Sequence, residues 1–550
     1  MENKTIARTF RLFSQLMELY DENPFKVRSM ANAAFKIDKL PFAIAQKSPD
    51  EMAVIDGIGK STAGKIQELL SDGTIAELQF LLDQTPEGVL EIMSVKGLGP
   101  KKVKIIWKEL GIESLGELLY ACNENRLIEA KGFGLKTQLE IKNAIEFKIA
   151  SNGCFLYAQI EAYATDLLQA LKARLNTEQV AFTGQFRRCC EVITSLDILI
   201  AGTEMPAIDD LFPDAEISLK GDTELQITTI SGLNTCIRTC PANEFKYQLF
   251  VQTGSEEHVQ EVLKRISTPV QLLSEAEIYK AGGLAYIEPE LREGLTEIRE
   301  AENGTLPQLI TFADLQGTLH NHSTWSDGVN TIKEMALFCR DELKLHYLGI
   351  SDHSKSAFYA NGLTEERVLA QQKEIDELNR ELAPFRIFKG IESDILFDGS
   401  LDYPDEILAT FDFVVASVHS VLKMNEEKAT SRLIKAIENP FITILGHPTG
   451  RLLLSRSGYS IDYKKVIDAC AANGVVMEIN ANPLRLDLDW RWHRYATEKG
   501  VLLSINPDAH RTSGFYDMHY GILAARKGGV SASNCLNAFS LDKITAFFNR

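Results

Sequence analysis

Histidine and carboxylate side chains, the residue types that bind divalent transition-metal ions, recur in seven short segments of the C-terminal part of this chain. The segments contain His320 and His322, Asp327, His353, Glu392, His419, His447, and Asp508 with His510. If these nine side chains lay together without cations, the carboxylates would repel one another and the histidines would lack partners. Their types and spacing therefore predict a multinuclear metal site.

Seven apolar runs predict the strands that position these side chains. They are residues 315–319, 347–350, 386–391, 413–418, 442–445, 475–479 and 501–505. Each metal-binding segment lies at or just past the end of such a run, and the ends of parallel strands converge on one mouth of an α/β barrel. We therefore expect the segments to meet there.

A single histidine at a strand end is more often structural than a metal ligand, and we interpret His258, His346, His493 and His519 in that way. Six of the ten histidines nevertheless fall at the predicted mouth. Three of their segments, residues 351–353, 417–420 and 508–510, also carry aspartate or serine. Because several independent segments agree, we prefer a metal site to chance placement.

The same segments resemble the PHP (polymerase and histidinol phosphatase) superfamily of phosphoesterases. The motifs that carry the resemblance are His320-Asn321-His322, Trp325-Ser326-Asp327-Gly328, Ser351-Asp352-His353-Ser354, Gly390-Ile391-Glu392, Ser417-Val418-His419-Ser420, Gly446-His447-Pro448-Thr449-Gly450-Arg451 and Pro507-Asp508-Ala509-His510. The resemblance implies a distorted (β/α)7 barrel with three divalent ions. It implies one ion held by His320, His322, Glu392 and Asp508, a second shared through Glu392 with His419 and His447, and a third held by Asp327, His353 and His510.

The mixed ligand set suits Mn²⁺, Zn²⁺ or Fe²⁺ without separating them. Such ions lower the pKa of a bound water from ~15.7 toward ~7 and stabilise the oxygens of a displacement at phosphorus. We therefore expect phosphoester hydrolysis, with Glu392, Asp508 and His510 in the catalytic centre. Arg451 and Arg485 are candidates for binding the phosphate, because a guanidinium offers two parallel donors. A role as surface salt-bridge partners is the alternative for both.

Length and composition bound the rest of the chain. Its 550 residues predict three or four domains, and 45% hydrophobic and 24% charged residues are ordinary for a globular protein. We expect neither a signal peptide at residues 1–20 nor a membrane span, because no apolar run approaches ~20 residues. Nine cysteines without a Cys-x-x-Cys pair favour a reducing cytoplasm.

Three Gly-x-Gly turns, each followed by a lysine-bearing helix, lie in the first 150 residues. They are Gly57-Ile58-Gly59, Gly97-Leu98-Gly99 and Gly132-Phe133-Gly134. This is the helix-hairpin-helix pattern, in which glycines let backbone N–H groups approach a DNA phosphate. The lysines expected near DNA are Lys60, Lys65, Lys101, Lys102 and Lys104, and residues 94–108 hold five lysines, Lys96 and Lys108 among them, and no acid. The net charge of -18 argues against nonspecific coating of DNA but permits this local binding.

After Gly153 the pattern changes to short strands, predicted at 180–182, 191–193, 196–200 and 224–228, which we expect to form an antiparallel sheet with helices. The expected domains are residues 1–85 and 86–152 (both helix-hairpin-helix), 153–240, 241–299, a linker at 300–312, and the barrel at 313–550.

The order of segments is similar to that of bacterial family X DNA polymerases, which have an N-terminal helical domain, fingers, palm and thumb, followed by a PHP domain. This resemblance extends over essentially the whole chain. The supporting motifs are Gly184-Gln185-Phe186-Arg187-Arg188, Leu196-Asp197-Ile198-Leu199, Thr253-Gly254-Ser255-Glu256-Glu257-His258 and Pro289-Glu290-Leu291-Arg292-Glu293-Gly294. The resemblance implies a palm with three metal-binding aspartates, of which this chain keeps only Asp197. Ser195 and Cys236 stand at the other two positions, Gln185 replaces the serine that binds phosphate, and Val251-Gln252 replaces Tyr-Phe. Lys65 matches the family's lyase lysine, although we favour a DNA contact for it.

We therefore expect a DNA-binding metallophosphoesterase with an inactive polymerase module. The expected activity is 3′-5′ exonucleolytic trimming, with abasic-site cleavage or 3′-phosphate removal as related reactions, on DNA ends, gaps or abasic sites. Three alternatives stay open: a polymerase with residual gap-filling activity, a small-molecule phosphatase of the histidinol-phosphatase type, and a DNA-binding scaffold whose metals are structural.

Overall fold

The structure, a computed structural model, describes residues 1–549 apart from 41, 96, 129, 151, 152, 214, 230 and 268. Lys96 of the predicted basic patch thus lies outside the described residues. The chain divides into two compact units, Met1–Glu146 and Phe147–Arg550, and each is described by itself. Among the described residues, no helix combines the length and apolar character needed to cross a membrane.

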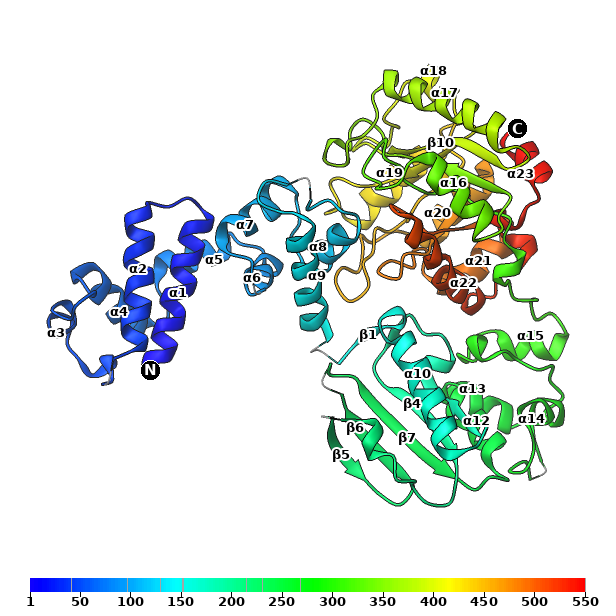
Figure 1. Ribbon diagram of the computed structural model, residues 1–550, viewed down its shortest axis with the longest axis horizontal. Coiled ribbons are helices and arrows are strands. Elements are labelled where there is room, and N and C mark those ends of the chain that lie inside the picture. The colour runs from blue at the N-terminus through cyan, green and yellow to red at the C-terminus, as the bar shows by residue number, and fades with distance from the viewer. Residues whose placement is uncertain are drawn as a thin grey trace. The chain divides into compact units, whose positions relative to one another are not determined.

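The first unit is helical (Figure 1, blue to cyan). Its helices are α1 (Asn3–Leu19), α2 (Pro24–Asp38), α3 (Pro49–Ala53), α4 (Lys60–Asp72), α5 (Ala76–Asp83), α6 (Glu87–Met93), α7 (Pro100–Lys104), which a π-helical turn at Ile105–Glu109 continues, α8 (Leu115–Asn123) and α9 (Leu135–Ala150). Phe10, Phe13 and Leu16 of α1 are fully or almost fully buried. The apolar face of α1 therefore forms part of the core of this unit.

The Gly-x-Gly segments form the expected turns. Gly57 and Gly97 have φ of +85° and +92°, a conformation that side chains with a Cβ rarely adopt. Gly59 and Gly99 are the N-cap residues of α4 and α7. A Cβ atom at Gly59, Gly97 or Gly99 would have no neighbour within 4 Å among the described residues. These turns therefore leave backbone N–H groups at helix starts accessible.

The second unit begins with a sheet of order β2-β4-β7-β6-β5, formed by Val180–Phe182, Leu196–Ala201, Asn234–Cys240, Glu224–Thr228 and Glu216–Lys220. The prediction of a purely antiparallel sheet is wrong, because β4 and β7 pair in parallel. Residues 192–193 form β3, which pairs with β1 (Phe155–Leu156) outside this sheet. α10 (Tyr157–Leu175) contributes buried residues to the same core.

Four helices follow: α12 (Phe245–Thr253), α13 (Glu256–Leu263), α14 (Glu275–Ala281) and α15 (Glu297–Asn303). The predicted linker at 300–312 therefore begins inside a helix, and α15 ends where Gly304 adopts the left-handed conformation. The apolar core of these helices reaches Leu309, whereas Ile310 belongs to the core of the next domain. The change of core lies within the predicted linker.

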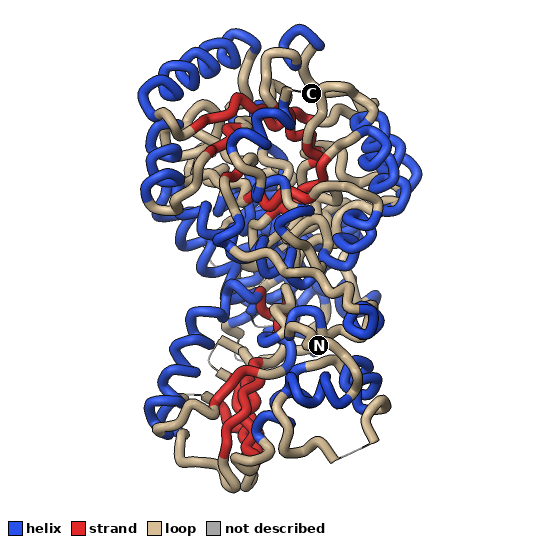
Figure 2. Tube along the Cα trace, turned by 90° about the vertical axis from the view of Figure 1, so that its right-hand side faces the viewer, coloured by secondary structure: helices blue, strands red, loops and turns tan. Residues whose placement is uncertain are grey.

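Seven parallel strands form the last sheet, in the order β14-β13-β12-β11-β10-β9-β8 (red strands with blue helices outside them in the upper part of Figure 2). The strands are β8 (Gly317–Thr318), β9 (Tyr347–Ile350), β10 (Arg386–Asp394), β11 (Phe413–Ser417), β12 (Ile444–Leu445), β13 (Val476–Asn480) and β14 (Leu503–Asn506). The helices are α16 (Ile332–Asp341), α17 (Glu365–Leu382), α18 (Asp405–Leu408), α19 (Glu426–Ile437), α20 (Tyr463–Asn473), α21 (His493–Glu498), α22 (Met518–Lys527) and α23 (Leu541–Phe548). An isolated bridge between Asn321 and Ala509 joins the two ends, so the barrel is nearly closed.

Glycines on the strands make room for aromatic rings inside the barrel. A Cβ atom at Gly317 would lie 2.1 Å from the Tyr347 ring, and one at Gly390 would lie 2.2 Å from Phe413. Tyr347 and Phe413 are buried with Leu319 and Phe388 in one apolar cluster. This packing closes the interior, so the predicted site is confined to the strand ends.

Candidate metal centre

All nine predicted ligands lie at one end of the barrel, seven of them buried and Asp327 and His419 partly buried. Glu392 lies on β10, and the other eight lie in the segments that follow β8, β9, β11, β12 and β14. Parallel strands end at the same rim, which is why residues distant in sequence come together. The structure therefore brings together the complete set.

Glu392 lies at the centre of this group. Its Oε1 atom is 3.3, 3.2 and 3.0 Å from the Nε2 atoms of His320, His419 and His447. Its Oε2 atom is 2.9 Å from His353 Nδ1 and 3.7 Å from His322 Nε2. One carboxylate thus faces five imidazoles, an arrangement suited to sharing between ions.

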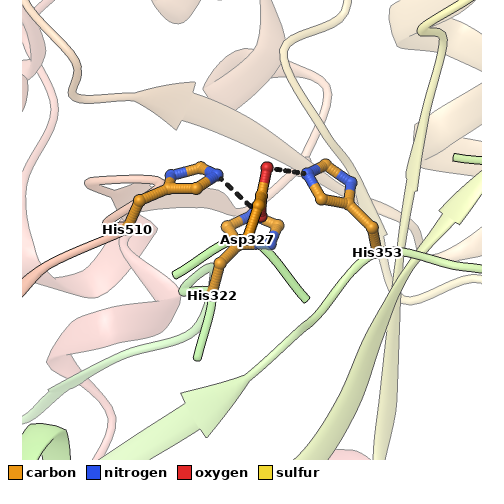
Figure 3. A group of neighbouring side chains, drawn as sticks. All are labelled: His322, Asp327, His353 and His510. Atoms are coloured by element: carbon orange, nitrogen blue, oxygen red, sulfur yellow. Dashed lines mark ion pairs between the residues drawn. The ribbon is translucent and has the colours of Figure 1, made fainter. Parts of the chain in front are cut away.

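Asp327 lies among a second group of histidines (Figure 3). Its Oδ1 atom lies 3.3 Å from His510 Nε2 and its Oδ2 atom 3.6 Å from His353 Nε2. These residues and His322 offer ligand atoms that lie within 4.8 Å of one another and could hold a metal ion. Two further groups with the same property are His320, His322 and Asp508, and His353, Glu392 and His419. His322 and His353 therefore each belong to two groups, whereas the family resemblance assigned each to one.

Unsatisfied polar atoms test whether this pocket fits metal ions. His322 Nδ1, His353 Nε2 and Asp327 Oδ2 are buried and form no hydrogen bond to any described residue. Leaving a buried polar atom without a hydrogen bond costs about 1–3 kcal/mol. Coordination to a cation would offset that cost, and imidazole and carboxylate donors match the ligand preference of divalent transition metals. The residues present therefore fit such ions.

The electrostatics keep the carboxylates ionised. Burial opposes their charge, but neighbouring imidazoles outweigh it and hold the pKa of Asp327, Glu392 and Asp508 below the ordinary range. Burial, with His510 and His353 beside it, lowers the pKa of His322 to about 3, so its ring is in the neutral form that binds metals. The acidic centre therefore offers both charged oxygens and neutral nitrogens.

Two carboxylates that the sequence analysis did not single out orient the histidines. His320 Nδ1 lies 2.7 Å from Glu478 Oε1, and His419 Nδ1 lies 2.5 Å from Asp394 Oδ1. Such partners fix the ring orientation of a metal-binding histidine. Asp394 follows Glu392 by two residues on β10, and alternate residues of a strand lie on the same face. This spacing could have identified Asp394 from the sequence. Glu478 on β13 also accepts a hydrogen bond from the backbone N–H of His447 (2.7 Å).

Arg451 and Arg485 occupy different environments. The guanidinium of Arg451 donates to the carbonyl oxygens of Arg485 (Nε, 2.9 Å) and Leu486, and to Asp489 (Nη1, 2.6 Å). These contacts engage Arg451 in the loop that carries Arg485, and Arg451 is buried rather than a surface salt-bridge partner. Arg485 is buried, and burial of His447, together with the charge of Arg485, lowers the pKa of that histidine. Arg485 is thus electrostatically coupled to the predicted centre.

The palm-like sheet places two positions of the predicted polymerase site side by side. Asp197 on β4 and Cys236 on β7 are register partners. Arg238 contacts Asp197 (3.6 Å) and Glu224 (3.1 Å), and the Cys236 thiol donates to Glu224 (3.2 Å). Burial raises the pKa of the thiol to about 12, with a further contribution from Glu224. The thiol therefore stays protonated at neutral pH and is a poor cation ligand.

Two of the other palm positions also have internal partners. Gln185 Oε1 accepts hydrogen bonds from the backbone N–H (2.9 Å) and the hydroxyl (3.0 Å) of Thr194, the residue before Ser195. Arg187 pairs with Glu275 of α14 at 2.6 Å. These contacts join the palm to its own loops and to the following helices.

The predicted DNA-binding lysines differ in their contacts. Lys60 and Lys101 are exposed at the starts of α4 and α7. Lys104 pairs with Asp21, and the Lys102 amine lies 5.7 Å from the centre of the Phe133 ring. Lys65 Nζ lies 2.7 Å from Glu77 Oε1, with its side chain 16% exposed. Lys60 and Lys101 are therefore the most accessible of the set.

Comparison with known proteins agrees with this architecture. The helix-hairpin-helix domain family matches residues 1–75, and the SAM-like helix-hairpin-helix tandem family matches residues 89–148. A protein of Bacillus subtilis (strain 168) named DNA polymerase/3′-5′ exonuclease PolX is 36% identical over 574 residues, covering 100% of both chains. A probable phosphatase of Thermoanaerobacter sp. (strain X514) is 29% identical over 170 residues, which are 29% of this chain and 67% of that protein.

The full-length similarity, the two helix-hairpin-helix regions and the nearly closed seven-stranded parallel barrel point to one family. The helix-hairpin-helix regions indicate that the chain binds DNA. The clusters at the barrel mouth indicate divalent metal binding. This chain belongs to the bacterial family X DNA polymerases that carry a C-terminal PHP domain.

Proposed function

We propose that this protein is a DNA-binding phosphoesterase that uses three divalent ions, Mn²⁺, Zn²⁺ or Fe²⁺, to trim DNA from the 3′ end, and that it does not polymerise DNA. The observation that carries the proposal is the position of Glu392 between five imidazoles, with Asp327 and Asp508 close by. The Bacillus subtilis relative is named as both a DNA polymerase and a 3′-5′ exonuclease, and the second of these activities supports the choice of reaction.

The proposed site divides its tasks among the chain's own residues. The nine ligands described above hold the ions, which when bound supply an activated water and neutralise charge on the phosphoryl oxygens. Glu478 and Asp394 orient His320 and His419 through their Nδ1 atoms. Arg485 binds a non-bridging phosphate oxygen, because a guanidinium matches the geometry of phosphate.

The proposed loss of polymerisation rests on the palm. Nucleotidyl transfer needs Mg²⁺ ions held by carboxylates, and Mg²⁺ prefers charged oxygen ligands. Asp197 retains one such carboxylate, but Arg238 lies beside it, and Ser195 and the protonated Cys236 supply none. We propose that this module binds and positions DNA for the barrel.

The test uses the full chain with Mn²⁺ and end-labelled single-stranded, gapped and abasic DNA, with and without nucleotides. The expected result is stepwise shortening from the 3′ end that Asp508→Ala abolishes. His346→Ala is the matched control, because His346 is exposed and precedes β9 at the other end of its strand. Undiminished cleavage by Asp508→Ala would contradict the proposal.

A small-molecule phosphatase is the second candidate, favoured by the similarity to probable phosphatases. It predicts that small phosphate monoesters are cleaved as fast as DNA. In that case substitution of Lys60 or Lys101 would leave turnover unchanged, whereas a DNA-directed enzyme would lose affinity for its substrate.

A further inference from the structure

Glu191, a carboxylate of the palm, contacts the barrel loop that leads away from Arg485. Glu191, just before β3, accepts hydrogen bonds from Trp490 Nε1 at 3.0 Å and from Arg491 Nη1 at 3.3 Å. Its side chain is 13% exposed. The Lys527 amine lies 4.7 Å from the centre of the Trp490 ring and donates to the carbonyl oxygen of Arg188 at 3.1 Å. The indole is therefore held between the two domains.

The contact continues into the barrel through Asp489. Arg491 Nη1 donates to both carboxylate oxygens of Asp489 at 3.0 Å, and Arg451 Nη1 donates to Asp489 Oδ2 at 2.6 Å. Arg451 in turn donates to the carbonyl oxygens of Arg485 and Leu486. Hydrogen bonds between charged groups are stronger than neutral ones, so this series fixes the backbone at Arg485.

The loop that carries Arg485 is also hydrogen-bonded to the segment that carries His447. Thr449, two residues after His447, donates from its N–H and its hydroxyl to Asp487 Oδ2, both at 2.9 Å. The loop at 485–489 and the His447 segment are thus one hydrogen-bonded assembly.

We propose that Glu191 is a positioning residue for the phosphoesterase, which places the Arg485 guanidinium for a DNA phosphate through Arg491, Asp489 and Arg451. The proposal rests on the proposed function. Donors that are already in place cost no reorganisation when the substrate binds, and a small displacement of a binding group reduces rate strongly. A palm that keeps only Asp197 of its three expected carboxylates thereby has a role in the barrel's reaction.

Inorganic phosphate, titrated calorimetrically into the Mn²⁺-loaded full chain, measures the Arg485 subsite without turnover. We expect Glu191→Ala to weaken phosphate binding about three- to tenfold and to raise KM for DNA by a similar factor, with a smaller change in kcat. Glu191→Gln should be intermediate, because its amide oxygen still accepts from the Trp490 indole. Glu161→Gln is the control, since Glu161 also links palm to barrel, at 2.7 Å from His519, without contacting this loop.

A double-mutant cycle separates positioning from general stabilisation. If Glu191 acts through Arg485, Glu191→Ala should add nothing to the loss caused by Arg485→Ala. Effects that multiply, or wild-type phosphate affinity in both Glu191 variants, would overturn the inference. Failure of the wild-type protein to cleave DNA with Mn²⁺ would instead contradict the proposed function, so the two failures are distinguishable.

Discussion

The barrel mouth and the palm are both places where strands bring acidic positions together, but they neutralise charge differently. At the mouth, Glu392 faces five imidazoles and the buried atoms His322 Nδ1 and Asp327 Oδ2 form no hydrogen bond to described residues. In the palm, Arg238 lies between Asp197 and Glu224, and Cys236 donates to Glu224. At the mouth, an added metal ion would give these buried ligand atoms a partner. In the palm, the Arg238 guanidinium is already paired with both carboxylates. The difference indicates that imidazoles balance the acidic charge at the mouth, whereas a guanidinium balances it in the palm-like sheet.

The most damaging change should remove the central charge of the mouth. Glu392→Gln keeps the shape of the side chain but deprives five imidazoles of their shared carboxylate, so we expect metal content to fall and DNA cleavage to become undetectable. Elemental analysis and a cleavage assay measure both effects. His346→Ala controls for general destabilisation, and normal metal content in the Glu392 variant would contradict the arrangement.

A smaller loss should follow removal of an orienting carboxylate. Glu478→Gln weakens the contact with His320 Nδ1 and should reduce activity or metal affinity about 10- to 100-fold. Addition of Mn²⁺ should recover part of the activity, because the nine predicted metal ligands are unchanged in this variant. A variant with wild-type metal affinity and rate would show that Glu478 serves the fold alone.

The helix-hairpin-helix turns should contribute affinity without chemistry. Lys60→Ala and Lys101→Ala should each weaken DNA binding regardless of sequence and reduce the slope of log K against log salt by about 1. Lys464→Ala is the matched control, since Lys464 is an exposed lysine on α20 of the barrel. An unchanged slope in the hairpin variants would mean that these lysines lie on a solvated face only.

The smallest effects should come from the palm positions. Asp197→Ala should leave DNA trimming unchanged, and the combined change Ser195→Asp with Cys236→Asp should not restore full synthesis, because Gln185 stays bonded to Thr194. A primer-extension assay on gapped DNA checks both. Template-dependent gap filling by the wild-type protein that Asp197→Ala abolishes and His320→Ala leaves intact would show that the palm is active.

The sequence by itself predicted that nine histidine and carboxylate side chains meet at the barrel mouth, and it predicted the strands that position them and the Gly-x-Gly turns. It could do so because each signal is local: an apolar run predicts a strand, and a polar residue at its end predicts the rim. The sequence predicted the ends of the strands less accurately: β8 spans only Gly317–Thr318 of the predicted run 315–319.

Only the tertiary structure decided which residues share neighbours. The parallel pairing of β4 with β7, the place of His322 and His353 in two ligand groups, and the contact of Arg451 with the backbone of Arg485 depend on how strands lie beside one another. The same holds for Glu191, which contacts Trp490 across 299 residues of chain. Such contacts arise from the packing of whole domains, and no local pattern of residues encodes them.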